Sequence, residues 1–255
     1  MSKKVNIISV ILATLTIAGW YYNYISPYYI ILLIIVYLTV VTIGTINIRF
    51  NFFLHSYCNS STTKKEIAIT FDDGPHPDIT PKLIKLLDLN NVPASFFCIG
   101  KNIDANSEIV TQMHNSNHII GNHSYGHSNF FDLFSSARMQ KEIVNTNIAI
   151  KKAIGKTPLL FRPPYGITNP MLSKAIKKSK KLSIGWSLRS LDTYKNSNQV
   201  LVKLKANTKA GDIVLFHDTN PNIISIIEEY IIWLNKNDFK IVSLTNLLNI
   251  PAYED

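Results

Sequence analysis

The chain has 255 residues, of which 46% are hydrophobic, a larger fraction than one soluble domain of that length requires. Its formal net charge of +9 suits an anionic surface or substrate, but the sequence contains no nucleic-acid-binding motif, so nucleic acid is not an expected partner. The two cysteines, Cys58 and Cys98, are too few for a disulfide framework and lack the spacing of a zinc or redox pair, so both are predicted to be structural.

Residues 1–50 contain no Asp or Glu, and their only charges are Lys3, Lys4 and Arg49. Within them, residues 5–22 and 28–46 are two apolar stretches, each close to the roughly 20 residues that a membrane-spanning helix needs. Aromatic residues gather where the first stretch ends and the second begins, as at a membrane interface: Trp20, Tyr21, Tyr22, Tyr24, Tyr28 and Tyr29. The segment is therefore predicted to be a two-helix transmembrane hairpin in contact with membrane lipid. The alternative is a cleaved secretory signal, but the first stretch lacks a small-residue cleavage site and a second span follows it.

After a predicted linker at 51–63, residues 64–255 alternate between short β-rich runs and helical periods. The expected strands lie at 66–71, 94–99, 118–122, 159–162, 182–187, 212–216 and 239–244. The expected amphipathic helices lie at 81–89, 137–154, 170–178, 198–207 and 223–234. Alternation over this length predicts a parallel sheet, and the number of repeats favours a distorted (β/α) barrel of about seven parallel strands, closed or nearly closed.

Polar clusters follow the predicted strands, at the end where a β/α barrel builds its active site. The first cluster is Asp72-Asp73, which follows the apolar run 67–71 and precedes a Gly-Pro turn. Adjacent carboxylates repel each other unless a cation or a shared proton relieves them, so a metal is one explanation and an ordinary acidic turn is the other.

His123 and His127 are four positions apart, so on a helical turn both imidazoles would project from one side toward a single ion. Two imidazoles and one carboxylate leave an open coordination position, which is typical of a catalytic zinc-type site. Such a histidine pair alone is often only surface. Its occurrence between the acidic cluster and Arg-Pro-Pro-Tyr at 162–165 makes the metal interpretation the stronger one.

Four motifs in this order resemble those of the polysaccharide deacetylase family, the NodB homology domain of carbohydrate esterase family four. They are Thr-Phe-Asp-Asp-Gly-Pro-His at 70–76, His-Ser-x-x-His at 123–127, Arg-Pro-Pro-Tyr at 162–165 and Leu-Phe-His at 215–217. The resemblance covers roughly residues 64–248.

The resemblance implies that Asp73, His123 and His127 hold a divalent metal, usually zinc. It further implies that Asp72 is the general base, that His217 protonates the departing amine, and that the backbone N–H of Tyr165 helps to hold the oxyanion. Arg162 would orient Asp72, and Asp192 would tune His217. Leu215, Tyr165 and Trp186 are expected to line the substrate pocket.

The chain departs from the family pattern after Asp192. The Trp that commonly follows this Asp is Thr193 here, and a second acidic residue often seen upstream is Arg189. A missing Trp removes one hydrophobic wall of the substrate groove, which favours a short substrate over a long polymer.

The function expected from these features is hydrolysis of an N-acetyl or N-formyl group on an amino sugar, in a cell-envelope glycan or a lipid-linked sugar. O-deacetylation of a polysaccharide and a catalytically inactive membrane-anchored glycan-binding protein are the alternatives. Basic residues before the first span and after the second predict a cytoplasmic catalytic domain, although the charges are few. The sequence leaves the oligomeric state open.

Overall fold

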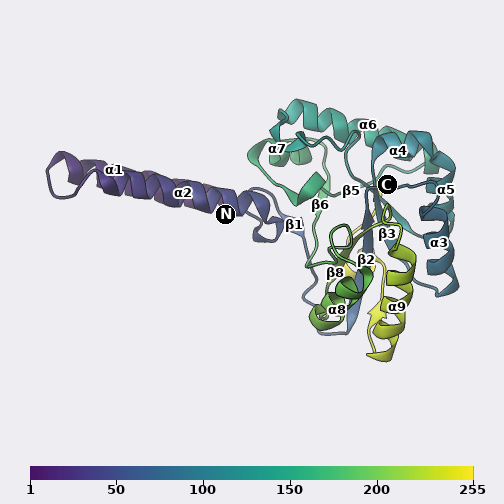
Figure 1. Cartoon of the computed structure of the whole chain (residues 1–255). Helices are drawn as coiled ribbons and strands as arrows, with labels where there is room; N and C mark the ends of the chain where they lie inside the picture. Colours follow the sequence, from purple (N-terminus) through teal and green to yellow (C-terminus); the bar gives the residue numbers. More distant parts are fainter. Residues whose placement is uncertain (255) are drawn as a thin grey trace.

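The computed structural model describes residues 1–254. Two helices project together from a compact α/β domain (Figure 1). The projecting helices are α1 (Ser2–Tyr21) and α2 (Tyr28–Ile46). Both are long and apolar enough to cross a bilayer, and Gly44 is their one buried residue. Polar contact between them is sparse, with Tyr37 Oη donating to Asn6 Oδ1 at 3.3 Å.

A parallel sheet of nine strands forms the centre of the domain, in the order β1-β6-β5-β4-β3-β2-β8-β7, with β9 also paired to β2. The strands are β1 (Ser56–Tyr57), β2 (Glu66–Asp72), β3 (Ala94–Cys98), β4 (Ile119–Asn122), β5 (Leu160–Phe161), β6 (Leu182–Ile184), β7 (Leu188–Arg189), β8 (Ile213–His217) and β9 (Lys240–Ile241). β2 lies near the middle and is buried from Ile67 to Asp72, which is why it reads as a continuous apolar run rather than an alternating one.

The sheet curls into a half-barrel, so the predicted parallel β/α architecture is confirmed while its closure is not complete. No ladder joins the end strands β1 and β7 among the described residues. An antiparallel bridge between Asn59 and Asp212 partly spans that gap. The expected strand at 182–187 keeps only Leu182–Ile184 as β6, and a separate strand, β7, begins after it at Leu188. β6 and β7 pair with different neighbours on the two sides of the gap.

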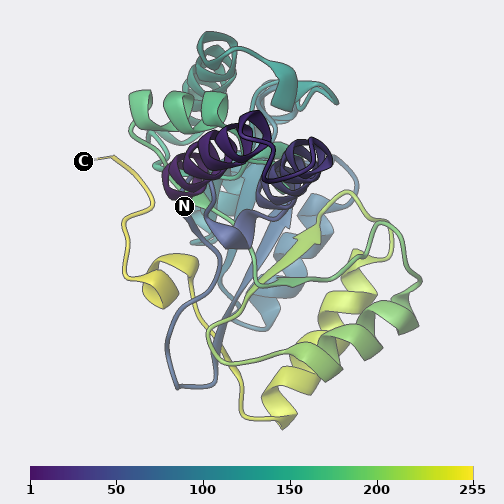
Figure 2. The ribbon, with the colours of Figure 1, turned by 90° about the vertical axis from the view of Figure 1, so that its left-hand side faces the viewer.

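Helices cover the outer face of the sheet, as Figure 2 shows from the side of the hairpin. They are α3 (Thr80–Leu89), α4 (Gly100–Ala105), α5 (Ser107–Asn115), α6 (Ser136–Ile154), α7 (Pro170–Lys178), α8 (Ser197–Asn207), α9 (Ile223–Lys236) and α10 (Leu244–Leu248). α6 illustrates how local sequence sets the bounds: Ser135 caps its first turn by accepting from Arg138 N, and Gly155 ends it at φ 73°. The largest core cluster lies between these helices and the central strands, with Phe71, Phe96 and Phe216 packed together.

The end of α2 is built into the domain. The backbone N–H of Thr168 donates to the carbonyl of Thr45 at 3.0 Å, and the buried ring of Phe52 packs so closely on Gly44 that a side chain there would overlap it. The expected linker at 51–63 is correspondingly structured, because it contributes β1 to the sheet and buries Cys58. The hairpin is thus joined to the domain through a packed junction.

Candidate metal and catalytic site

The carboxyl ends of the central strands bring the predicted site residues together. In the sheet register Asp72 is opposite His217 on β8, and Asn122, the residue before His123, is opposite Phe161, the residue before Arg162. A pocket of about 360 Å³ opens at this edge. It is lined by Asp72, Asp73, His123, His127, Tyr165, Gly166, Trp186, Arg189, Thr193, Tyr194, Leu215 and His217.

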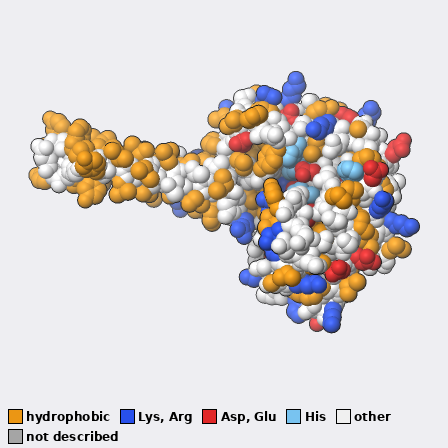
Figure 3. Space-filling view, viewed as in Figure 1, with side chains coloured by type: hydrophobic (Ala, Val, Ile, Leu, Met, Phe, Trp, Pro, Cys, Tyr) orange, Lys and Arg blue, Asp and Glu red, His pale blue; other side chains and the backbone are white. Residues whose placement is uncertain are grey.

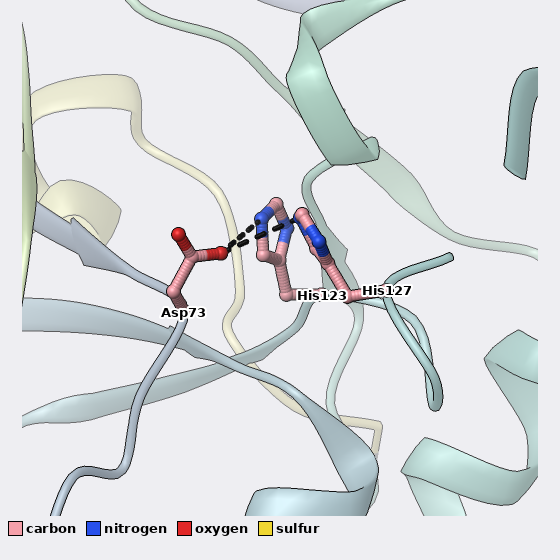
Figure 4. A group of neighbouring side chains, drawn as sticks. All are labelled: Asp73, His123 and His127. Atoms are coloured by element: carbon pink, nitrogen blue, oxygen red, sulfur yellow. Dashed lines mark ion pairs between the residues drawn. The ribbon is translucent and has the colours of Figure 1, made fainter. Parts of the chain in front are cut away.

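Asp73, His123 and His127 face one another in this pocket (Figure 4). Asp73 Oδ1 lies 3.5 Å from His123 Nε2 and 3.4 Å from His127 Nε2, and the three donor atoms all fall within 4.8 Å of one another. Asp73 Oδ1 is buried and has no hydrogen-bond partner among the described residues. A buried orphan carboxylate oxygen between two imidazole nitrogens fits a divalent cation.

The second ring nitrogen of His123 supports the same geometry. His123 Nδ1 lies 2.8 Å from the carbonyl oxygen of Arg162, which fixes the ring so that Nε2 points toward Asp73. Such an outer contact is what a metal-binding histidine usually has.

The pKa values in this trio reflect burial and mutual charge. Burial lowers the pKa of His127 and the neighbouring His123 lowers it further, to about 4, so His127 is neutral near pH 7. Burial acts to raise the pKa of Asp73, but its contacts with the two histidines outweigh that effect and hold the pKa well below its usual range. A neutral imidazole and an ionised carboxylate are the states in which these groups bind metal.

The two histidines converge through a strained loop, and the helical turn expected from their spacing is not formed. His127 has φ 45° and Ser124 has φ 62°, both in the left-handed region. The loop is held by Glu142 of α6, whose Oε2 accepts from the backbone N–H groups of Tyr125 at 3.1 Å and Gly126 at 2.7 Å. The loop, rather than a helical turn, therefore brings the two imidazoles together.

Asp72 is paired with a buried arginine. Arg162 Nη1 donates to Asp72 Oδ1 at 2.7 Å and also to the Thr70 hydroxyl at 2.9 Å. The arginine is fully buried, its Nη2 donates to the carbonyl of Gly185 at 3.0 Å, and its guanidinium lies 4.1 Å from the centre of the Phe97 ring. The pair fixes the orientation of Asp72.

His217 forms a second charged pair in the same pocket. His217 Nδ1 lies 2.9 Å from Asp192 Oδ1, and the Ser190 hydroxyl donates to that same oxygen at 2.6 Å. Burial lowers the pKa of His217, but the bond to Asp192 and its charge raise it more, so the net shift is upward. With Nδ1–H donated to Asp192, Nε2 is the ring atom left to exchange a proton in the pocket.

Tyr165, Leu215 and Trp186 lie on the pocket wall, where the sequence placed them. Tyr165 has φ 59°, and its hydroxyl donates to Asn129 Oδ1 at 2.8 Å. Gly166 approaches the Trp186 ring so closely that a side chain at this position would overlap it. Strained backbone at Asp73, His127 and Tyr165 persists only because the surrounding contacts determine it, a pattern common at functional sites.

Several supporting residues were missed by the sequence interpretation. Asp218 lies against Gly74 and accepts from Thr80 Oγ1 at 2.7 Å, so it supports the loop that carries Asp73. Burial raises the pKa of Asp218 to about 7. Tyr194, 78% exposed, places an aromatic ring at the pocket mouth beside Thr193. Of these supporting residues, only Ser190 could have been found from the sequence, because it lies two residues before the motif residue Asp192.

Comparison with known proteins gives a consistent result. The sequence profile of the family described as "Polysaccharide deacetylase" matches residues 59–182. A peptidoglycan-N-acetylglucosamine deacetylase of Bacillus cereus is 32% identical over 192 residues, covering 72% of this chain and 89% of that protein. A chitooligosaccharide deacetylase of Rhizobium leguminosarum bv. phaseoli is 32% identical, covering 66% of this chain and 74% of that protein. Other relatives are longer: the chain spans 57% of a second Bacillus cereus deacetylase and 39% of the Listeria monocytogenes peptidoglycan-N-acetylglucosamine deacetylase PgdA.

Solved structures agree with the sequence relatives. The Bc1960 peptidoglycan N-acetylglucosamine deacetylase superposes with a TM-score of 0.73 at 26% identity, covering 78% of this chain and 95% of that chain. A carbohydrate esterase family four pseudoenzyme from Bacillus anthracis shares the fold with a TM-score of 0.70 at 23% identity, covering 76% of this chain and 68% of that chain. Since the fold occurs with and without activity, the residues of the site must decide the function. The fold, the motifs and these relatives together show that the chain belongs to the polysaccharide deacetylase family.

Proposed function

We propose that the chain is a metal-dependent hydrolase that removes an N-acetyl or N-formyl group from an amino sugar, in a cell-envelope glycan or a lipid-linked sugar. The observation that carries this proposal is the convergence of three units in one pocket. They are the Asp73–His123–His127 trio, the Asp72–Arg162 pair and the Asp192–His217 pair.

Asp73, His123 and His127 are the residues that would hold the metal. A divalent cation bound there, with zinc as the first candidate from the N and O donor set, would lower the pKa of a coordinated water and polarise the amide carbonyl. The remaining chemistry belongs to the side chains around the trio.

Asp72, oriented by Arg162, would accept a proton from the attacking water. The backbone N–H of Tyr165 would donate to the developing oxyanion. His217 would deliver the proton on Nε2 to the departing nitrogen, while Asp192 stabilises the charged ring. Leu215, Tyr165 and Trp186 would bound the space for a small acyl group and its sugar.

The relatives favour a nitrogen over an oxygen as the leaving atom. The Bacillus cereus and Listeria monocytogenes proteins are named for deacetylation of N-acetylglucosamine. O-deacetylation and inactive glycan binding remain the competing functions, and product analysis separates all three.

The test uses the purified full chain with glycan oligomers that carry both N-acetyl and O-acetyl groups. Released acetate and free amine should appear in equal amounts, a strong chelator should abolish both, and added zinc should restore them. Acetate without free amine would indicate an O-deacetylase. Undiminished turnover by verified metal-free protein, or sugar binding without any acetate release, would refute the proposed function.

We also propose that α1 and α2 anchor the protein in a membrane, with the catalytic domain on the cytoplasmic face. Their exposed apolar side chains form a surface much larger than a monomeric soluble protein normally presents to water, as Figure 3 makes clear. Lys3 and Lys4 lie in the first turn of α1, and Arg49 follows α2, so positive-inside reasoning puts both ends of the hairpin on the same, cytoplasmic side. Two reporters fused after residue 255, one active only inside the cell and one only outside, would decide the side. Activity of the outside reporter alone would refute this orientation.

A further inference from the structure

A second pocket, of about 500 Å³, lies between the active site and the base of the hairpin. It shares Trp186 and Arg189 with the active-site pocket, so the two cavities are neighbours on either side of these side chains. Its other lining residues are Arg49, Asn59, Ser187, Leu188, Lys203, Asn207, Lys209 and Asp212. None of them was assigned a role by the motifs.

Four cations line this pocket: Arg49, Arg189, Lys203 and Lys209. Within residues 1–254, none of the four forms an ion pair with a carboxylate. The single acidic residue of the pocket, Asp212, already accepts from the Ser187 hydroxyl at 2.6 Å and from the backbone N–H of Lys209 at 2.7 Å. The pocket therefore carries an uncompensated positive charge.

The cations interact with one another inside this space. Burial lowers the pKa of Lys203, and the nearby charges of Lys195, Arg189 and Arg49 lower it further. Arg189 Nε is buried and has no hydrogen-bond partner among the described residues. A buried guanidinium N–H without an acceptor, among unpaired cations, is a feature that an anion would satisfy.

The position of the pocket relates it to the membrane anchor. Arg49 belongs to the short 3-10 helix η1 (Ile48–Phe50), directly after the end of α2 at Ile46. Its Nη1 donates to the carbonyl of Ser187 at 3.5 Å, which keeps it on the rim of the pocket. Lys and Arg side chains are visible near the base of the projecting helices in Figure 3. A bilayer that held the hairpin would end close to this rim.

We propose that this cationic pocket, defined by Arg49, Arg189, Lys203 and Lys209, binds the phosphate of a glycosyl phospholipid substrate. The inference rests on the proposed function: the amino sugar occupies the active-site pocket, its phosphate lies beyond Trp186 in the cationic pocket, and its lipid chain enters the bilayer beside α2. Guanidinium groups suit this task because their N–H fork matches the oxygens of a phosphate. Trp186 and Arg189 line both pockets, so a phosphate bound in the cationic pocket lies about one sugar away from the catalytic residues. This position favours the substrate's own phosphate over the headgroup of a bilayer lipid as the ligand.

Two synthetic probes test the assignment: dodecyl N-acetylglucosaminide and dodecyl N-acetylglucosaminyl phosphate, which differ only in the phosphate. The full chain is loaded with zinc in phosphatidylcholine nanodiscs, and both dissociation constants and deacetylation rates are measured. We expect the phosphodiester to bind about tenfold more tightly, the usual worth of one or two charge-assisted contacts. The double variant Arg49→Gln/Lys209→Gln should lose this preference and retain the binding and turnover of the uncharged glycoside. Lys205→Gln, an exposed position on α8 outside the pocket, is the matched charge control and should behave as the parent does.

The outcomes separate the two hypotheses. If the parent protein releases acetate from the uncharged glycoside but shows no preference for the phosphodiester, the phosphate assignment is wrong and the proposed function stands. If neither probe is hydrolysed while the phosphodiester binds preferentially through Arg49 and Lys209, the phosphate pocket stands and N-deacetylation fails. If the preference disappears once phosphatidylglycerol is added to the nanodiscs, the pocket holds a bilayer headgroup, and the substrate assignment is overturned.

Discussion

Replacing Arg162 by Met is the change that most directly tests the buried pair on which the site depends. The methionine side chain can occupy much of the same space, but Asp72 is left 4% exposed without its cation. The hydroxyl of Thr70 and the carbonyl of Gly185 also lose a donor. We therefore expect a large loss of stability together with loss of hydrolysis.

The expected magnitude follows from breaking a buried ion pair by removing one partner, which costs roughly 3–5 kcal/mol because the remaining charge is uncompensated. In a domain of this size 1 kcal/mol corresponds to about 2–4 °C, so the midpoint of thermal unfolding should fall by roughly 6–20 °C. The double variant Arg162→Met/Asp72→Asn replaces the stranded carboxylate by a neutral amide. It should regain about 1–3 kcal/mol relative to Arg162→Met alone.

Urea unfolding of the catalytic domain, followed by tryptophan fluorescence in detergent, measures these free energies without reference to activity. Arg138→Met is the matched control, because Arg138 is exposed and only stacks on Phe134, and it should cost less than about 1 kcal/mol. The reasoning is refuted if Arg162→Met costs no more than this control, or if adding Asp72→Asn makes the protein still less stable.

Three further predictions concern catalysis. Asp72→Asn should abolish hydrolysis and keep the metal, whereas His123→Ala should lose both hydrolysis and the metal. Metal analysis of the purified variants checks this, and loss of metal from Asp72→Asn would mean that the roles of the two carboxylates are misassigned. His217→Ala should lower kcat by roughly 10² to 10⁴ with unchanged metal content, and a near-normal rate would mean that another group protonates the amine. Asp192→Asn removes the negative charge that helps to raise the pKa of His217, while burial still lowers it. The fall of kcat/KM at high pH, where His217 loses its proton, should therefore move to lower pH. An unmoved alkaline limb would assign that limb to a different group.

The candidate site residues could be predicted because each ends or follows a strand that the local sequence already indicates. Asp72 and His217 end strands that are continuous apolar runs, so their position at one edge of the sheet follows from the strand pattern alone. The loops that carry Asp73 and the two histidines are supported by residues far from them in sequence. Glu142 reaches the histidine loop from the middle of α6, and Asp218, directly after β8, reaches Gly74 beyond the end of the neighbouring strand β2. Neither contact leaves a periodic signal.

The elements that the sequence patterns missed are short, or lie where a strand and a helix follow each other closely. β1 and β7 have two residues each, so no alternation can reveal them. α4 has six residues and begins at a glycine, a weak helix former, and it is separated from α5 by only Asn106. The expected strand at 239–244 keeps only Lys240–Ile241, since Ser243 caps α10 by accepting from Asn246 N. The secondary structure of these segments is determined by strand pairing in the folded domain and by side-chain capping, rather than by a local sequence pattern.

The packed junction between α2 and the domain affects how the enzyme would encounter its substrate. Thr168 is bonded to the last turn of α2, and Phe52 fills the surface over Gly44, so no free tether lets the pocket swing away from the hairpin. In a bilayer the active site would travel at a fixed height, and its search for substrate would be two-dimensional. Turnover would then follow the surface density of substrate in the membrane rather than its bulk concentration. Inserting a flexible glycine-serine segment between Asn47 and Phe52 would widen the reach of the pocket and dilute the local substrate that the anchor supplies.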